Sequence, residues 1–142
     1  MVCCFQMTLS GYGPNLTLGI GPSRFQEIFK VLADGLHDYT TDERGDVGSW
    51  IRVSCIQAIG VSISRLLAEP HPPRPEDWLP RPMYCAAVAG ILKQGAERLD
   101  NVRQEAGFQI LGMLQRADSE TENEGHVYRL DGHEALWKLF DL

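Results

Sequence analysis

The chain has 142 residues, of which 44% are hydrophobic and 23% charged, and its formal net charge is -6. These proportions are typical of a soluble globular domain with an ordinary core. Domains that bind nucleic acid or anionic membranes usually present a basic surface, so the acidic balance argues against both as partners. No apolar stretch approaches the roughly 20 residues that a membrane-spanning helix needs. We therefore expect no membrane insertion.

Cysteine usage points to a reducing compartment. The four cysteines, Cys3, Cys4, Cys55 and Cys85, form no C-x-x-C pair, and the last two lie inside helical patterns. We expect all four to be reduced thiols, with Cys55 and Cys85 as small core residues. The first residues also lack the basic segment of a signal peptide. A cytoplasmic location is the expectation.

Residues 1–22 are rich in Gly and Pro and show no regular pattern, so we expect an irregular N-terminal segment there. A helical-repeat domain over 23–142 should follow. Its first helix is expected to begin at Ser23, with Gln26 completing a capping box. One face of this helix is apolar at 3- and 4-residue steps, through Phe25, Ile28, Phe29, Leu32, Leu36 and Tyr39.

A polar turn over 40–46 separates this helix from a second one, which should start near the cap residue Asp46 and end before Pro70. Its expected apolar stripe includes Trp50 and Ile51. Residues 70–82 contain many prolines, and this composition predicts an extended connection.

Three further helices are predicted. One runs from Met83 to about Leu99, with Pro82 in its first turn, and the next is capped by Asp100. An acidic loop over 118–124 should precede a terminal helix from His133 to Phe140. Because no stretch alternates as a half-buried strand does, the predicted fold is all-α.

The second and fourth predicted helices share a pattern. An apolar residue precedes Arg52 in one and Arg103 in the other, and each arginine is followed by a small residue three positions on and an aliphatic residue seven positions on. Such a repeated pattern is typical of HEAT-type repeats, in which antiparallel helix pairs stack into an α-solenoid of the HEAT/armadillo kind. We expect this chain to be a fragment of a longer solenoid.

Residues 39–52, YTTDERGDVGSWIR, are more distinctive than a repeat pattern requires. They closely resemble the corresponding stretch of the tubulin-folding cofactor D family, and two further segments, ERLDNVR at 97–103 and HEALWKLF at 133–140, agree in the same order. The resemblance runs from about Phe25 to the end of the chain. It corresponds to the carboxyl-terminal part of a much longer protein.

The resemblance implies a solenoid chaperone that captures β-tubulin released from the cytosolic chaperonin. It implies cooperation with cofactors E and C and an ADP-ribosylation-factor-like GTPase in assembling or dissociating the tubulin heterodimer. It further implies that the complex stimulates GTP hydrolysis at a site that belongs to tubulin. A cytoskeleton-associated protein with no cofactor of its own is the corresponding expectation.

Within the distinctive turn, the candidate partner-binding residues are Asp42, Glu43, Arg44, Trp50 and Arg52. A solvated loop of mixed charge is the competing interpretation for the charged residues, and a core position is the favoured one for Trp50.

Three other residues, Asp46, Asp100 and Arg103, are expected to act as caps and repeat contacts. The tripeptide Arg44-Gly45-Asp46 resembles an integrin-binding motif, but a tight bend followed by a cap explains it better.

The sequence does not favour an enzyme. The histidines have no zinc-like spacing, and the Gly-x-Gly segments lack the context of a phosphate-binding loop. A nucleophilic role for Cys85 or Cys55 has no local signature and ranks last. The main alternative to a tubulin chaperone is a generic helical-repeat adaptor for another protein.

Overall fold

The structure, a computed structural model, describes residues 20–67, 74–119, 128–130 and 132–140. Its helices are α3 (Pro22–Gly35), α4 (Gly48–Leu66), α5 (Pro75–Trp78), α6 (Arg81–Gln94), α7 (Asp100–Ser119) and α8 (His133–Phe140). Two strands of two residues each, β1 (Thr41–Asp42) and β2 (Gly45–Asp46), lie between α3 and α4. The prediction of an all-α fold is confirmed. Most of the predicted Gly/Pro-rich N-terminal segment lies outside the described residues.

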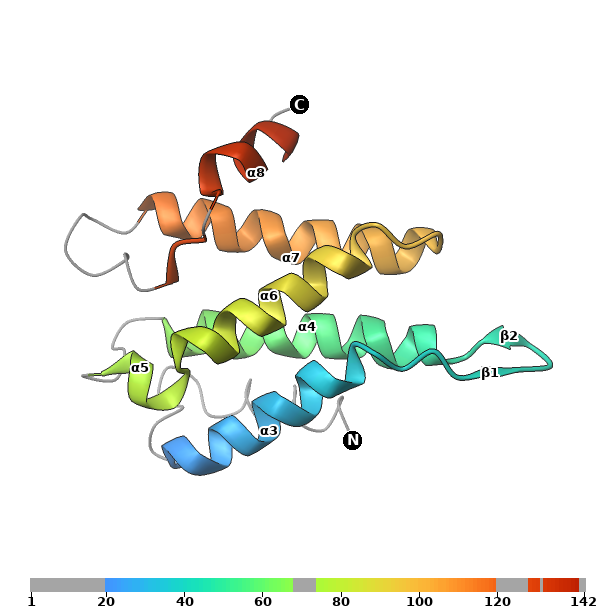
Figure 1. Cartoon of the computed structure of the whole chain (residues 1–142), viewed down its shortest axis with the longest axis horizontal. Helices are drawn as coiled ribbons and strands as arrows, with labels where there is room; N and C mark the ends of the chain where they lie inside the picture. The colour runs from blue at the N-terminus through green and yellow to red at the C-terminus, as the bar shows by residue number, and fades with distance from the viewer. Residues whose placement is uncertain (1–19, 68–73, 120–127, 131, 141–142) are drawn as a thin grey trace.

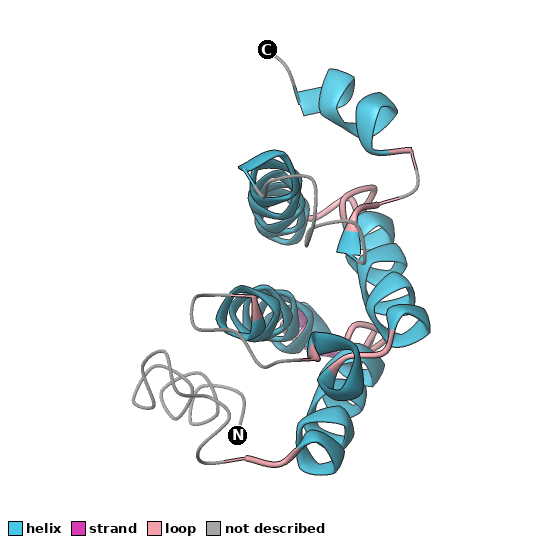
Figure 2. Ribbon diagram, turned by 90° about the vertical axis from the view of Figure 1, so that its left-hand side faces the viewer, coloured by secondary structure: helices cyan, strands magenta, loops and turns pink. Residues whose placement is uncertain are grey.

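The four long helices form two antiparallel pairs, α3 with α4 and α6 with α7 (Figure 1). Packing between α4 and α7, and between α3 and α6, joins one pair to the other. Figure 2 shows the result as two columns, with α4 and α7 in one and α3 and α6 in the other. Both turns within the pairs therefore lie at the same end of the molecule, where the β1–β2 hairpin projects beyond the helices (Figure 1).

Helix α4 supplies much of the core because it is apolar around most of its circumference. Its buried apolar residues are Cys55, Ile56, Ala58, Ile59, Ile63 and Leu66. Trp50 and Ile51, predicted on the same buried stripe, are exposed instead. Gly48, Ser49 and Arg52 at the same end of α4 are buried, so Trp50 and Ile51 lie on the outward face of the helix.

The start of α3 differs from the predicted capping box. The helix begins at Pro22, one residue before Ser23, and Gly21 at its N-cap makes no side-chain cap bond. Gln26 donates instead to the carbonyl oxygen of Asp77, at 2.8 Å. This bond ties α3 to α5, and Phe25 packs edge-on against Trp78 with the ring centroids 6.1 Å apart.

The predicted extended connection is therefore wrong in its second half. Residues 75–78 form one helical turn, and α6 already begins at Arg81. A proline suits the first turn of a helix because its missing N–H has no partner there, and both α5 and α6 carry one at that place. The rest of this connection, 68–73, lies outside the described residues.

The two caps predicted for α4 and α7 have different outcomes. Val47 is at the N-cap position of α4, but the Oδ1 of Asp46, the residue before it, accepts the backbone N–H of Ser49 at 3.0 Å. Asp46 therefore supplies the side-chain cap predicted for it. Asp100 is already the first helical residue, and its carboxylate pairs with Arg103 rather than with a backbone N–H. The N–H of Arg103 bonds to the carbonyl oxygen of Leu99. Leu99 therefore occupies the cap position, and the predicted cap at Asp100 is wrong.

The end of the chain follows the prediction closely. Helix α8 covers the predicted range and packs against α7. The predicted acidic loop begins inside α7, whose last residue is Ser119, and its remainder lies outside the described residues.

Candidate partner-binding site

The distinctive turn folds as a small β-hairpin rather than a plain loop. Thr41 pairs with Asp46 and Asp42 with Gly45, which leaves Glu43 and Arg44 at the tip. Gly45 has φ of +110°, a region that side-chain-bearing residues rarely adopt, so a glycine is needed where the chain turns back. The strands escaped prediction because each has only two residues, too few to show alternation.

The hairpin base crosses the start of α4 at close range. Gly48 donates its N–H to the carbonyl oxygen of Thr40 at 2.9 Å. A Cβ on Gly48 would lie 2.5 Å from the backbone oxygen of Asp38 and 2.8 Å from the backbone nitrogen of Thr40. A glycine is therefore required here to let the hairpin start against the helix.

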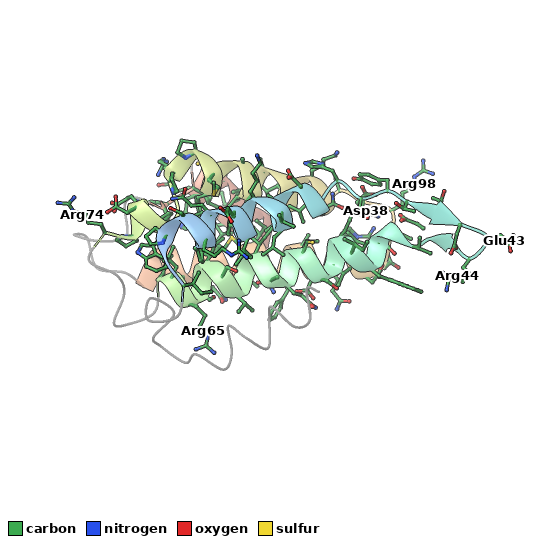
Figure 3. All side chains as sticks on the ribbon, turned by 90° about the horizontal axis from the view of Figure 1, so that it is seen from below. Asp38, Glu43, Arg44, Arg65, Arg74 and Arg98 are labelled. Atoms are coloured by element: carbon green, nitrogen blue, oxygen red, sulfur yellow. The ribbon has the colours of Figure 1, made fainter. Side chains whose placement is uncertain are left out.

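Asp42 holds Arg44 in a fixed position. The carboxylate of Asp42 accepts the backbone N–H of Arg44 at 2.7 Å and two guanidinium bonds at 3.0 and 2.6 Å. The hydrogen bonds from the Arg44 side chain have the largest effect on the pKa of Asp42, followed by the bond from the Arg44 backbone N–H. Both lower this pKa below its usual value. Glu43 remains exposed at the outermost point of the hairpin, beside Arg44 (Figure 3).

Trp50 and Arg44 meet on the outside of the molecule. The Arg44 guanidinium carbon lies 5.7 Å from the centre of the Trp50 ring, within the range of a cation–π contact. Trp50 is 62% exposed, an unusual state for the largest apolar side chain. The predicted residues Asp42, Arg44 and Trp50 thus form one exposed cluster, which we call the hairpin platform.

Arg52 lies beneath the platform and is completely buried. It donates to the carbonyl oxygen of Asp38 at 2.6 Å and to both carboxylate oxygens of Asp46 at 3.2 and 2.8 Å, and its guanidinium lies 4.3 Å from the Tyr39 ring centre. Hydrogen bonding with Arg52 lowers the pKa of Asp46, and the same bonds raise the pKa of Arg52. In this conformation Arg52 offers no surface to a partner, and its role is to fix the hairpin on α4.

Arg103 makes the corresponding contacts in the second pair. It donates to the carbonyl oxygen of Glu97 at 3.0 Å and pairs with Asp100. Both bonds lie within one helix pair, so Arg103 holds a turn and does not bridge repeats as predicted. Repeat-to-repeat bonds come from other residues: Gln57 donates to Glu105 at 2.9 Å, and Arg116 donates to the oxygens of Ser64 at 3.0 and 2.7 Å.

The sequence reasoning missed the residues that join the two turns. Tyr39 donates its hydroxyl to Glu97 at 2.6 Å, and buried Gln94 donates to the carbonyl oxygen of Leu36 at 2.9 Å. Tyr39 was assigned to the apolar stripe of α3, but that helix ends at Gly35. A buried glutamine within the apolar run of α6 was the available signal, because such a side chain requires hydrogen-bond partners.

Other potential sites receive no support. Both oxygens of Asp46 are engaged by Arg52 and Ser49, so the Arg44-Gly45-Asp46 tripeptide does not present the free carboxylate of an integrin motif. Burial raises the pKa of the Cys55 thiol to about 11, which disfavours a thiolate. Cys85 is exposed on α6, contrary to the core position predicted for it. Among the described residues, no group of three potential metal ligands comes together, and no helix has the length and apolarity to span a bilayer.

The fold and the platform together define a class: an all-α protein of stacked helix pairs with an exposed tryptophan and two charged side chains at the end that carries the turns. Residues 85–141 match the family described as tubulin folding cofactor D C terminal. The match begins inside α6 and includes α7 and α8, so the hairpin platform lies before it. No solved structure gives a significant match.

Proposed function

We propose that this chain acts as a binding module of a tubulin-folding cofactor and carries out no chemistry of its own. In this proposal it contacts β-tubulin and takes part in assembling or dissociating the tubulin heterodimer. Cofactors E and C and an ADP-ribosylation-factor-like GTPase are the proposed co-workers, and the GTP hydrolysis that the complex stimulates takes place on tubulin. The proposed location is the cytoplasm, in association with the cytoskeleton.

The two stacked helix pairs support the idea that the chain is part of a HEAT-type solenoid. Each pair packs on the next through α4 with α7 and α3 with α6, which is how repeats of this kind bury their second face. Equivalent arginines, Arg52 and Arg103, hold the turn of each pair. Such solenoids present rows of equivalent helices and turns to a protein partner.

The exposed indole of Trp50 is the observation that carries the proposed contact. Binding energy at protein interfaces is concentrated in a few Trp, Tyr and Arg side chains, and the platform holds Trp50 and Arg44 in contact. Three bonds from Arg44 to Asp42 fix the arginine before any partner arrives. An already ordered side chain loses less conformational entropy on binding. The hairpin is also the part of the described chain that projects farthest from the helices (Figure 1).

The test is binding of purified β-tubulin to an intact cofactor that carries Trp50→Ala. Loss of an interface tryptophan typically costs about 2 kcal/mol or more, so we expect a dissociation constant at least about thirtyfold higher. Val31→Ala is the matched control, because Val31 is an equally exposed apolar side chain on α3. Equal affinity of the Trp50 variant and wild type would exclude the platform as the contact.

A further inference from the structure

Tyr39 connects the turns of the two helix pairs. Its hydroxyl donates to Glu97 Oε1 at 2.6 Å and accepts a bond from Gln94 Nε2 at 3.2 Å. Gln94 is the last residue of α6, and Glu97 lies in the turn between α6 and α7. Gln94 also donates to the carbonyl oxygen of Leu36, three residues before Tyr39. These three bonds form a latch between the pairs at the base of the hairpin, and Tyr39 is its exposed member.

Among the tyrosines that the structure describes, Tyr39 alone is accessible. Its exposed fraction is 43%, whereas Tyr84 and Tyr128 are both buried. The hydroxyl of Tyr128 also donates to the carbonyl oxygen of Leu79, inside the core. Tyr39 lies in the irregular stretch between α3 and β1, outside any helix or strand. The carbonyl oxygens of its neighbours Asp38 and Thr40 accept bonds from Arg52 and Gly48 of α4.

The charges around Tyr39 are arranged in two groups. The hydroxyl faces the Glu97 carboxylate beside the last turn of α6, where the helix dipole is negative. The ring is flanked by cations instead, with Arg52 at 4.3 Å and Lys93 Nζ at 5.4 Å from its centre. A phosphate on the hydroxyl would repel Glu97 and would be attracted toward Lys93. The neutral hydroxyl fits this site, and a doubly charged group does not.

Two buried polar atoms, one in the latch and one on Arg52 beside the Tyr39 ring, have no partner among the described residues. Arg52 Nε and Gln94 Oε1 are both buried and make no hydrogen bond there. A buried network that is only partly satisfied holds its members less firmly than a complete one.

We propose that Tyr39 is a phosphorylation site and that its modification opens the latch between the two helix pairs. A tyrosine kinase would transfer the terminal phosphoryl group of ATP to Oη of Tyr39. The bond from the terminal phosphorus to the bridging oxygen of ATP breaks, the new P–Oη bond forms, the phenolic proton goes to the base of the kinase, and ADP leaves. The Tyr39–Glu97 bond is lost, and the base of the hairpin is released from the second pair.

The first part of the test is accessibility. The 142-residue protein is treated with ATP and, separately, with each of a panel of tyrosine kinase domains, and the modified residues are identified by mass spectrometry of peptides. We expect phosphate on Tyr39 before any appears on Tyr84 or Tyr128. Absence of phosphate from Tyr39 with every kinase in the panel would overturn the proposal.

The second part is the effect on the latch, measured by amide hydrogen exchange over residues 37–40 and 95–98. Charge-assisted hydrogen bonds hold these turns, so phosphorylation should speed exchange there by about tenfold or more. Tyr39→Phe, which loses the bond without gaining charge, should give a smaller increase. Phosphorylated protein carrying Glu97→Gln should also give a smaller increase, because repulsion by Glu97 is absent. Unchanged exchange in the phosphorylated wild type would contradict the proposal, as would an equal increase in the Glu97→Gln variant.

Discussion

Arg52 and Arg103 make the same bond in the two helix pairs: each donates from the first turns of the second helix to a backbone carbonyl of the turn before it. The acceptors are Asp38 for Arg52, at 2.6 Å, and Glu97 for Arg103, at 3.0 Å. Each arginine also pairs with an aspartate near the start of its own helix. The shared pattern in the sequence thus encodes one device, an arginine that closes the turn of a helix pair.

The two arginines should differ in their effect on stability. Arg52 is completely buried with an aspartate partner, whereas half of the Arg103 side chain is exposed. Arg52→Ala removes several charge-assisted bonds, so we expect a loss of about 3 kcal/mol in unfolding free energy and a melting temperature about 10 °C lower. Arg103→Ala should cost less than about 1 kcal/mol. Thermal melts of both variants measure this, and equal losses would contradict the assigned difference in burial.

Asp46 and Asp100 should differ in their effect on stability in the same order as their arginine partners. Asp46→Ala removes the cap of α4 and the partner of Arg52 together, so its melting temperature should fall clearly. Asp100→Ala breaks one exposed ion pair, which is worth less than about 0.5 kcal/mol. Differential scanning calorimetry decides between them. A larger decrease in melting temperature for the Asp100 variant than for the Asp46 variant would support the cap that the sequence predicted at Asp100.

The helices of this fold could be predicted from the sequence because the spacing of their apolar residues agrees with the residues that start and end a helix. His133–Phe140 has both and emerged with the predicted bounds. The hairpin could not be predicted, because its two-residue strands consist of polar residues and depend on the close fit at Gly48. The burial of Arg52 could not be predicted either, since arginines are usually exposed and its carbonyl partner lies across a turn. Trp50 illustrates the reverse case: its spacing suggested burial, but it lies on the exposed face of α4, while Ser49 and Arg52 are buried.

Stability should depend on pH through Asp46. Its pKa is lower in the folded protein than in the unfolded chain, so the unfolded chain binds the proton more readily. The stabilisation is therefore complete above the ordinary aspartate pKa of about 4 and is lost as the pH falls through the lowered value. Melting temperatures measured from pH 6 to pH 2 should fall less steeply for Asp46→Asn than for wild type. Parallel curves would exclude Asp46 as a contributor.

Two glycines should respond in opposite ways to alanine. A Cβ on Gly112 would meet nothing within 4 Å, so Gly112→Ala should gain helix propensity and raise stability by up to about 1 kcal/mol. A Cβ on Gly48 would lie against the backbone of Asp38 and Thr40, which cannot move as a flexible side chain does. Gly48→Ala should therefore destabilise the protein and detach the hairpin base. Chemical denaturation of both variants measures the difference, and a stabilised Gly48 variant would contradict the close fit.

The contact with β-tubulin proposed above should depend on the platform and little on overall charge. The chain carries a net charge of -6, and tubulin is itself acidic, so long-range electrostatics oppose association. The binding energy must then come from local fit at Asp42, Arg44 and Trp50. The double variant Asp42→Ala with Arg44→Ala, made in an intact cofactor, should raise the dissociation constant by about thirtyfold while the melting temperature stays unchanged.

The matched control changes charge without touching the platform. Neutralising Glu120, Glu122 and Glu124, all in the acidic segment after α7, should leave affinity unchanged or strengthen it slightly. Raising the salt concentration screens the repulsion and should speed association of wild type to a small degree. Wild-type affinity in the platform variant would mean that the hairpin serves only folding. A strong decrease in wild-type affinity at high salt would mean that an attractive charged surface elsewhere makes the contact.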